Sequence, residues 1–212
     1  LGSLALYDQP CQALANATGR IILSVDYRLA PEYPFPRPLE DVYQALCWVY
    51  EQAHRLGIDA SRLAVGGDSA GGNMAAATAL LARDRGGPHI EHQLLLYPAL
   101  SRDMATESYR EFAEGYFLTR DAMAFCWDNY LGLRRHPYAE PLHAASLSGL
   151  PPATILSCEY DPLRDEAEDY AQRLQKAGVK VRSERLQGMV HACIHMSGLT
   201  PATGQLFELA RG

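Results

Sequence analysis

A glycine-flanked serine stands at Gly67-Asp68-Ser69-Ala70-Gly71. It matches Gly-x-Ser-x-Gly, the sharp turn between a strand and a helix that holds a serine hydroxyl exposed. The surroundings fit, because a strand-like run ends at Gly66 and a helical pattern begins within two residues of Ser69. The alternative is an ordinary connection or a phosphate-cradling loop, in which Ser69 only caps the helix. Neither Gly-x-x-x-x-Gly-Lys nor Gly-x-Gly-x-x-Gly occurs, so nucleotide binding has no support, and we interpret Ser69 as a nucleophile.

A serine hydroxyl is a weak nucleophile until an imidazole accepts its proton, so one of the seven histidines must serve as the base. His191 follows a predicted strand at 179–186 through a loop at the strand's carboxyl end, where α/β sheets place functional groups. His195 is the rival. Helical spacing places His195 on the next turn, and a role as a cap or core histidine suits it better. We therefore favour His191.

The third group must be a carboxylate that holds the imidazole in one tautomer, and the order Ser, acid, His places it between 69 and 191. Asp161 lies just past a predicted strand at 153–158. Asp165 is the alternative, but it falls in the first turn of the next helix, where the helix dipole already explains a negative charge. Asp161 is the preferred acid.

Apolar strand-like runs alternate with longer helical patterns along the chain, which predicts an α/β fold with a mainly parallel sheet covered by helices on both faces. The predicted strands are 21–25, 62–66, 93–98, 153–158 and 179–186. The predicted helices are 4–17, a segment from 39 toward Gly57, 70–83, 163–177 and 200–211.

Residues 103–140 interrupt this alternation with many aromatic side chains on helical patterns. We expect them to form a helical cap insertion, and residues 1–102 and 141–212 to form the core domain. A cap over Ser69 would exclude water and bind the apolar part of a substrate. Most of the aromatics are nevertheless expected to pack against the insertion's own helices.

The 212 residues are 48% hydrophobic and 21% charged, enough apolar material for one sizeable core. The net charge is -6 and the basic residues form no stripe, so we expect no nucleic-acid partner. No apolar run approaches the roughly 20 residues of a membrane span, so no membrane partner is expected. Five scattered cysteines, without Cys-x-x-Cys or a histidine cluster, favour a reducing, cytoplasmic location without a metal. A homo-oligomer remains open.

Four segments carry a family resemblance: 24–32, 67–73, 161–166 and 188–191. Together they resemble the hormone-sensitive-lipase family of α/β-hydrolase esterases over essentially the whole chain. The resemblance implies hydrolysis of short-chain carboxylic esters through an acyl-enzyme on Ser69, with His191 as general base and Asp161 as its orienting acid. A small-molecule ester is then the partner, and no cofactor is needed.

The same resemblance implies roles for four neighbours of the triad. The backbone N–H of Ala70 is the expected oxyanion donor. Asp68 is a substrate-binding candidate, and Leu163 and Val190, which flank the acid and the base, are expected to line the acyl pocket.

The chain departs from the family in one respect, because the family's oxyanion loop, His-Gly-Gly-Gly, does not occur in it. Leu1-Gly2-Ser3 resembles the segment that comes directly after that loop, so we expect this chain to begin at that point. In the family a further strand lies between those at 21–25 and 62–66. Either these two strands pair directly, another chain supplies an edge, or, as we favour, the natural protein carries the N-terminal segment. The alternatives to an active esterase are a catalytically impaired remnant and a small-molecule binding module on the same scaffold.

Overall fold

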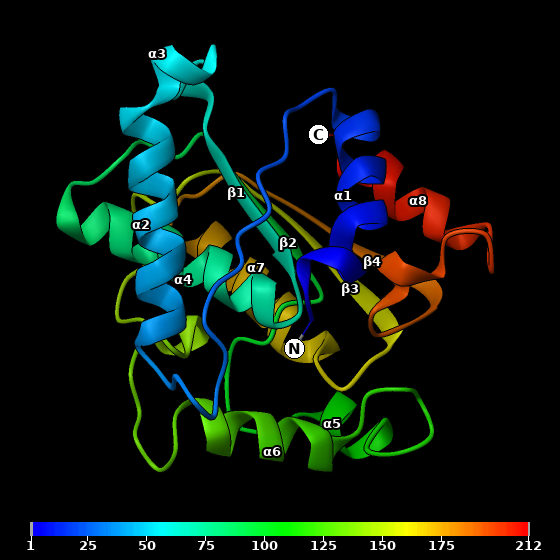
Figure 1. Cartoon of the computed structure of the whole chain (residues 1–212). Helices are drawn as coiled ribbons and strands as arrows, with labels where there is room; N and C mark the ends of the chain where they lie inside the picture. The colour runs from blue at the N-terminus through cyan, green and yellow to red at the C-terminus, as the bar shows by residue number, and fades with distance from the viewer. Residues whose placement is uncertain (1, 212) are drawn as a thin grey trace.

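The computed structural model describes residues 2–211, and a four-stranded parallel sheet runs through its centre in the order β1-β2-β3-β4 (Figure 1). The strands are β1 (Ala64–Asp68), β2 (His92–Leu96), β3 (Ala153–Tyr160) and β4 (Val181–Val190). The helices are α1 (Leu4–Thr18), α2 (Arg37–Glu51), α3 (Ala53–Leu56), α4 (Ala70–Arg85), α5 (Glu107–Glu111), α6 (Arg120–Tyr130), α7 (Arg164–Lys176) and α8 (Ala202–Leu209). Three short 3-10 turns are η1 (Ala60–Arg62), η2 (Pro141–His143) and η3 (Cys193–Met196). The predicted α/β class and parallel sheet are confirmed.

Alternate residues of the strands face two different helix layers, as the two-residue period of a strand requires. Leu95 and Ile155 belong to a buried cluster with side chains of α4 and α7. Leu96 and Leu156 belong to another buried cluster, with side chains of η3 and α8 and with α1 packed at its edge. The sheet is therefore covered on both faces, and only its ends are free to present functional groups.

The 103–140 insertion lies at the carboxyl ends of the strands, where α5 and α6 sit below the sheet in the view of Figure 1. Tyr109, Phe112 and Trp127 are buried, and Tyr109 and Trp127 pack in a cluster with Leu163. Phe117 and Phe125, in contrast, are 72% and 67% exposed. Buried side chains of the insertion thus pack in one apolar cluster with residues of α2, of α4 and of the start of α7.

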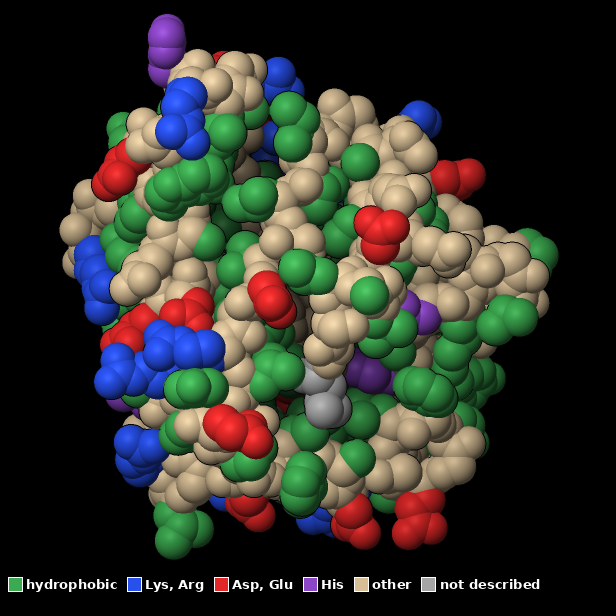
Figure 2. All heavy atoms as spheres, in the orientation of Figure 1, with side chains coloured by type: hydrophobic (Ala, Val, Ile, Leu, Met, Phe, Trp, Pro, Cys, Tyr) green, Lys and Arg blue, Asp and Glu red, His purple; other side chains and the backbone are tan. Residues whose placement is uncertain are grey.

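The predicted strand at 21–25 is wrong, because residues 20–29 run extended without joining the sheet. Its β-branched residues favour a strand, but a strand also needs a hydrogen-bonding neighbour, and β1 pairs only with β2. Direct pairing of 21–25 with 62–66 is therefore wrong as well. Ile21 and Leu23 remain 80% and 56% exposed, and hydrophobic side chains are visible along much of the face in Figure 2.

Polar anchors hold this extended segment at its two ends. Arg20 donates to the carbonyl of Arg62 and pairs with Glu91, and Arg28 forms a bidentate pair with Asp41 of α2. These contacts fix the path of the chain between α1 and α2 without strand hydrogen bonds.

Several element boundaries also differ from the prediction by a few residues. β4 continues to Val190 instead of ending at Leu186, because its last residues pair with β3 across an irregular register between Cys158 and Tyr160. The helical segment from 39 toward Gly57 is divided at Gln52 into α2 and α3.

No helix among residues 2–211 combines the length and the apolar character that crossing a bilayer requires.

Candidate active site

Ser69 occupies a strained turn between the end of β1 and the start of α4, with φ of 54° and ψ of -116°. Gly67 makes this turn possible. A Cβ atom added at Gly67 would stand 2.3 Å from the backbone carbon of Gly71, so residue 67 has no room for a side chain. A non-glycine residue at positive φ costs about 1–3 kcal/mol and persists only where its surroundings impose it.

Three side chains from three strand ends meet at this turn. Nε2 of His191 lies 2.8 Å from Oγ of Ser69, and Nδ1 of His191 lies 2.7 Å from Oδ2 of Asp161. The other carboxylate oxygen of Asp161 accepts the backbone N–H of Leu163 at 2.9 Å. Asp161 is fully buried and His191 is 4% exposed, so little water competes with these bonds.

The partners of His191 fix its tautomer. An ionised carboxylate only accepts hydrogen bonds, so Nδ1 must carry the proton that faces Asp161. In the neutral ring Nε2 is then an acceptor, and the Ser69 hydroxyl donates to it. This is the arrangement in which the imidazole can take the serine proton.

The rival residues lie elsewhere. The ring of His195 stands edge-on to Tyr7 of α1, with centroids 4.8 Å apart, and no hydrogen bond joins it to Ser69. Asp165 accepts the N–H of Ser108 and pairs with Arg164. Burial raises the pKa of Asp165, but the Ser108 amide and the Arg164 guanidinium outweigh it and hold that pKa below its usual value.

Ala70 is exposed at the first position of α4. Its N–H is one of the four amide groups that a helix start leaves without an internal acceptor. The helix dipole adds positive potential at the same point. An oxyanion formed beside Ser69 could therefore be stabilised from this side.

The three substrate-binding candidates differ in accessibility. Asp68 is 8% exposed, and its carboxylate accepts a hydrogen bond from the Tyr7 hydroxyl at 3.1 Å. Burial raises the pKa of Asp68 above its usual value. Leu163 is fully buried under the insertion, whereas Val190 is partly exposed. Only Val190 of the three offers surface to a solvent-borne ligand without rearrangement.

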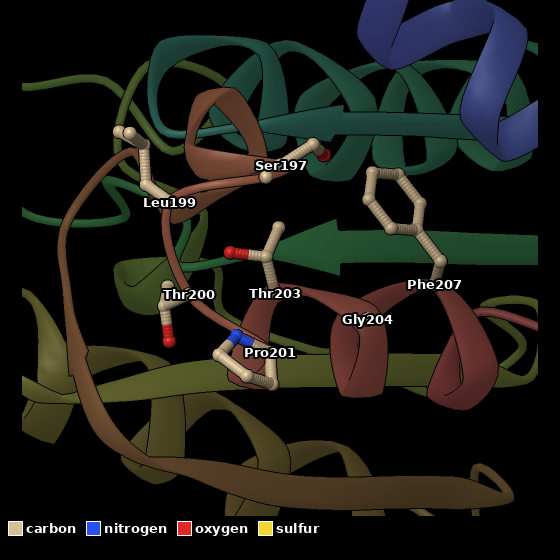
Figure 3. Close-up of a pocket in the computed structure, with 8 residues that line it drawn as sticks. Ser197, Leu199, Thr200, Pro201, Thr203, Gly204 and Phe207 are labelled. Carbon is tan, nitrogen blue, oxygen red and sulfur yellow. The ribbon is translucent and has the colours of Figure 1, made fainter.

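A separate cavity of about 410 Å³ lies between the loop 197–201 and α8. Figure 3 shows Leu199 on the loop and Thr203 and Phe207 on the helix around it. Ser69, Asp161 and His191 are not among its lining residues. The cavity is therefore a feature apart from the triad.

Between residues 2 and 211 no group of three or more His, Cys, Asp or Glu side chains is placed to hold a metal ion.

Two further residues contact the triad segments, and sequence patterns did not single them out. Tyr97, after β2, packs its ring against that of His191. Ser108, in α5, bonds to the turn that follows Asp161. Tyr97 lies inside a run predicted as strand and Ser108 inside the insertion, so only the fold could bring them to the site.

Comparison with known proteins agrees with this architecture. A family model described as alpha/beta hydrolase fold matches residues 1–195. The chain is 43% identical to carboxylesterase NlhH of Mycobacterium tuberculosis over 97% of its own length and 66% of that protein. It is 41% identical to an arylesterase of Saccharolobus solfataricus over 91% of its own length and 64% of that protein. The chain thus spans just under two thirds of these relatives.

A solved structure gives the same result in three dimensions. The crystal structure of a thermostable esterase from Pseudomonas putida superimposes with a TM-score of 0.96 at 41% identity, covering 100% of this chain and 68% of that one. The matched family model, the relatives and the shared fold lead to one conclusion. This chain belongs to the α/β-hydrolase family, in its hormone-sensitive-lipase-like branch.

Proposed function

We propose that this protein is a serine carboxylesterase that hydrolyses short-chain esters through an acyl-enzyme on Ser69. The observation that carries the proposal is the unbroken chain of hydrogen bonds from Asp161 through His191 to Ser69, with distances of 2.7 and 2.8 Å. The names of the relatives, carboxylesterase and arylesterase, support the reaction class.

In the first half of the reaction, Nε2 of His191 accepts the proton of the Ser69 hydroxyl as Oγ attacks the ester carbonyl carbon. Asp161 stabilises the imidazolium that forms. The tetrahedral oxyanion then collapses, the carbon–oxygen bond to the alcohol breaks, and His191 donates its proton to the departing alkoxide. The acyl group remains on Ser69.

In the second half, His191 removes a proton from a water molecule that attacks the acyl carbon, and the carboxylic acid leaves as Ser69 regains its proton. The N–H of Ala70 is our proposed donor to both oxyanions. A single donor of this kind contributes roughly 10²- to 10³-fold to kcat.

We further propose that residues 103–140 form a cap over the core made of 1–102 and 141–212. The position of α5 and α6 at the carboxyl ends of the strands supports this division. In this arrangement we propose that the partly exposed Val190 lines the acyl pocket and that Leu163 supports its wall from within the apolar cluster that the insertion shares with α2 and α4. We propose that Asp68 supports the turn that carries Ser69 through its hydrogen bond with Tyr7. A direct contact with substrate is not proposed for Asp68, because its carboxylate is already bonded and buried.

Hydrolysis of p-nitrophenyl acetate by the 212-residue chain tests the proposal. Ser69→Ala removes the nucleophile, and we expect turnover to fall by at least about 10³-fold. Ser148→Ala, at an exposed serine, serves as the matched control and should keep wild-type turnover.

Undiminished hydrolysis by Ser69→Ala would contradict the proposal. A folded wild-type chain that binds the ester without releasing p-nitrophenol would also contradict it and would favour a binding module.

A further inference from the structure

Backbone strain gathers around the triad. Four non-glycine residues among 2–211 have positive φ, and three of them belong to segments of the site: Ser69 at 54°, Tyr97 at 35° and Ala192 at 62°. Ser69 is the proposed nucleophile and Ala192 follows the proposed base, whereas Tyr97 has no role in the mechanism above. Strained residues persist where the surrounding structure imposes them, so contacts with neighbouring residues must hold Tyr97 in this conformation.

The segment that carries Tyr97 holds the backbone of the nucleophile from both sides. The N–H of Ser69 donates to the carbonyl of Leu96 at 2.9 Å, and the N–H of Ala99 donates to the carbonyl of Ser69 at 3.2 Å. The segment is itself tied to the sheet, because the N–H of Tyr97 donates to the carbonyl of Leu156 at 2.6 Å. The position of Ser69 therefore depends on residues 96–99.

The side chain of Tyr97 holds the loop of the base. Its ring stands edge-on to the ring of His191, with centroids 4.9 Å apart and an interplanar angle of 64°. Its hydroxyl accepts the N–H of Ile194 at 3.3 Å, three residues beyond His191. Tyr97 is fully buried and packs in one cluster with Cys193 and Ile194, so neighbouring side chains enclose its ring.

We propose that Tyr97 is a positioning residue that sets the separation between Ser69 and His191. Its backbone segment fixes one partner of the 2.8 Å hydrogen bond and its side chain fixes the other, so a shift of this one residue changes that distance directly. A misplacement of about 1 Å at a reacting group can cost 10²-fold in rate. The inference rests on the proposed function, because it assigns Tyr97 a role in that same reaction.

Two variants separate the contacts of Tyr97. Tyr97→Phe removes only the hydroxyl that Ile194 uses, and Tyr97→Leu also removes the ring that faces His191. Tyr170→Phe is the matched control, because Tyr170 is equally buried, lies in the cluster on the other face of the sheet, and its hydroxyl has no hydrogen-bond partner among residues 2–211.

Hydrolysis of p-nitrophenyl acetate gives kcat and KM for each variant, with kcat divided by the concentration of active sites titrated with a fluorophosphonate. We expect kcat to fall about 5-fold in Tyr97→Phe and about 100-fold in Tyr97→Leu, with KM unchanged within about twofold. Tyr170→Phe should retain both constants. A residue that only supports the fold would lower the number of titrated sites and leave kcat per site unchanged, and that result overturns the proposal.

Amide hydrogen exchange tests the same contact without turnover. Exchange of the Ile194 N–H should accelerate in Tyr97→Phe relative to wild type and Tyr170→Phe, because its acceptor is gone. Unchanged exchange at Ile194 overturns the proposal. Failure of the proposed function is a different result, since it would appear as wild-type turnover in Ser69→Ala whatever Tyr97 does.

Discussion

The hydroxyl of Ser108 in α5 donates a hydrogen bond to the carbonyl of Pro162 at 2.7 Å, one residue beyond Asp161. The same hydroxyl accepts the N–H of Asp165 at 3.3 Å, and the N–H of Ser108 donates to the Asp165 carboxylate at 2.8 Å. The 103–140 insertion is therefore bonded to both sides of the turn that leads from Asp161 into α7.

Ser108→Ala should weaken this attachment. It leaves the buried carbonyl of Pro162 without its donor, which costs about 1–3 kcal/mol, and it also removes the acceptor of the partly buried Asp165 amide. Urea unfolding should show the loss as a lower midpoint relative to wild type and to the exposed-site control Ser148→Ala. Equal midpoints in all three proteins would show that Ser108 does not hold the insertion.

Asp161→Asn tests which carboxylate orients His191. The amide of asparagine can donate to Nδ1, which selects the tautomer whose Nε2 cannot accept the Ser69 proton, so kcat should fall about 10⁴-fold. Asp165→Asn keeps the bond between Asp161 and His191 and should lower kcat far less. The two variants differ only in position, and a larger loss in Asp165→Asn would contradict the assignment.

From the burial of Glu166 we expect the free energy of unfolding to depend on pH. It is fully buried, one carboxylate oxygen accepts the N–H of Leu100 at 2.6 Å, and the other has no partner among residues 2–211. Burial raises the pKa of Glu166 well above its usual value, so the folded protein keeps the proton that the unfolded chain releases above about pH 4.3. The free energy of unfolding must then decrease as pH rises from that value through the folded pKa.

Glu166→Gln removes this titration and imitates the protonated carboxyl. Its stability advantage over wild type should grow as pH rises from about 4.3 and become constant above the folded pKa. Urea midpoints at pH 5 to 9 measure it, with Glu32→Gln as the exposed control. A wild type that gains stability over the variant with rising pH would contradict a protonated Glu166.

The two buried thiols near the triad should resist modification. Sγ of Cys158 lies 3.7 Å from Sγ of Cys193, and both residues are fully buried. The contact with Cys193 and burial raise the pKa of the Cys158 thiol far above its ordinary value, and only the thiolate reacts readily.

Titration with 5,5′-dithiobis(2-nitrobenzoate) should therefore modify only the partly buried Cys11, Cys47 and Cys126 in the folded protein. Cys158 and Cys193 should react only after unfolding in guanidinium chloride. A Cys158→Ala, Cys193→Ala double variant identifies them, because it should keep the native count and lower the unfolded count by two. Rapid reaction of all five thiols in the folded protein would contradict the predicted protection.

Much of the sheet and the triad candidates could be predicted from the sequence, because their signals are local. Ser69 stands in a turn motif, and Asp161 and His191 each follow a strand closely, at the edge where parallel strands end together. The strand at 21–25 shows the limit of such signals. Its residues favour a strand, but pairing with β1 is a tertiary property that the segment does not encode.

The supporting contacts could not be predicted for the same reason. Ile194 reaches Tyr97 across 97 positions, and Ser108 reaches Pro162 across 54. Tyr97 alone is indistinguishable from any core aromatic at the end of a strand. Its role depends on the packing that places it beside His191.

Covalent labelling of the folded chain with a fluorophosphonate, followed by peptide mass spectrometry, tests the central claim most directly. We expect one adduct per chain, located on Ser69, and a labelling rate at least about 10³-fold slower in His191→Ala. A folded chain that forms no adduct, or that carries it on another residue, would contradict the assignment of Ser69 as the nucleophile that His191 activates.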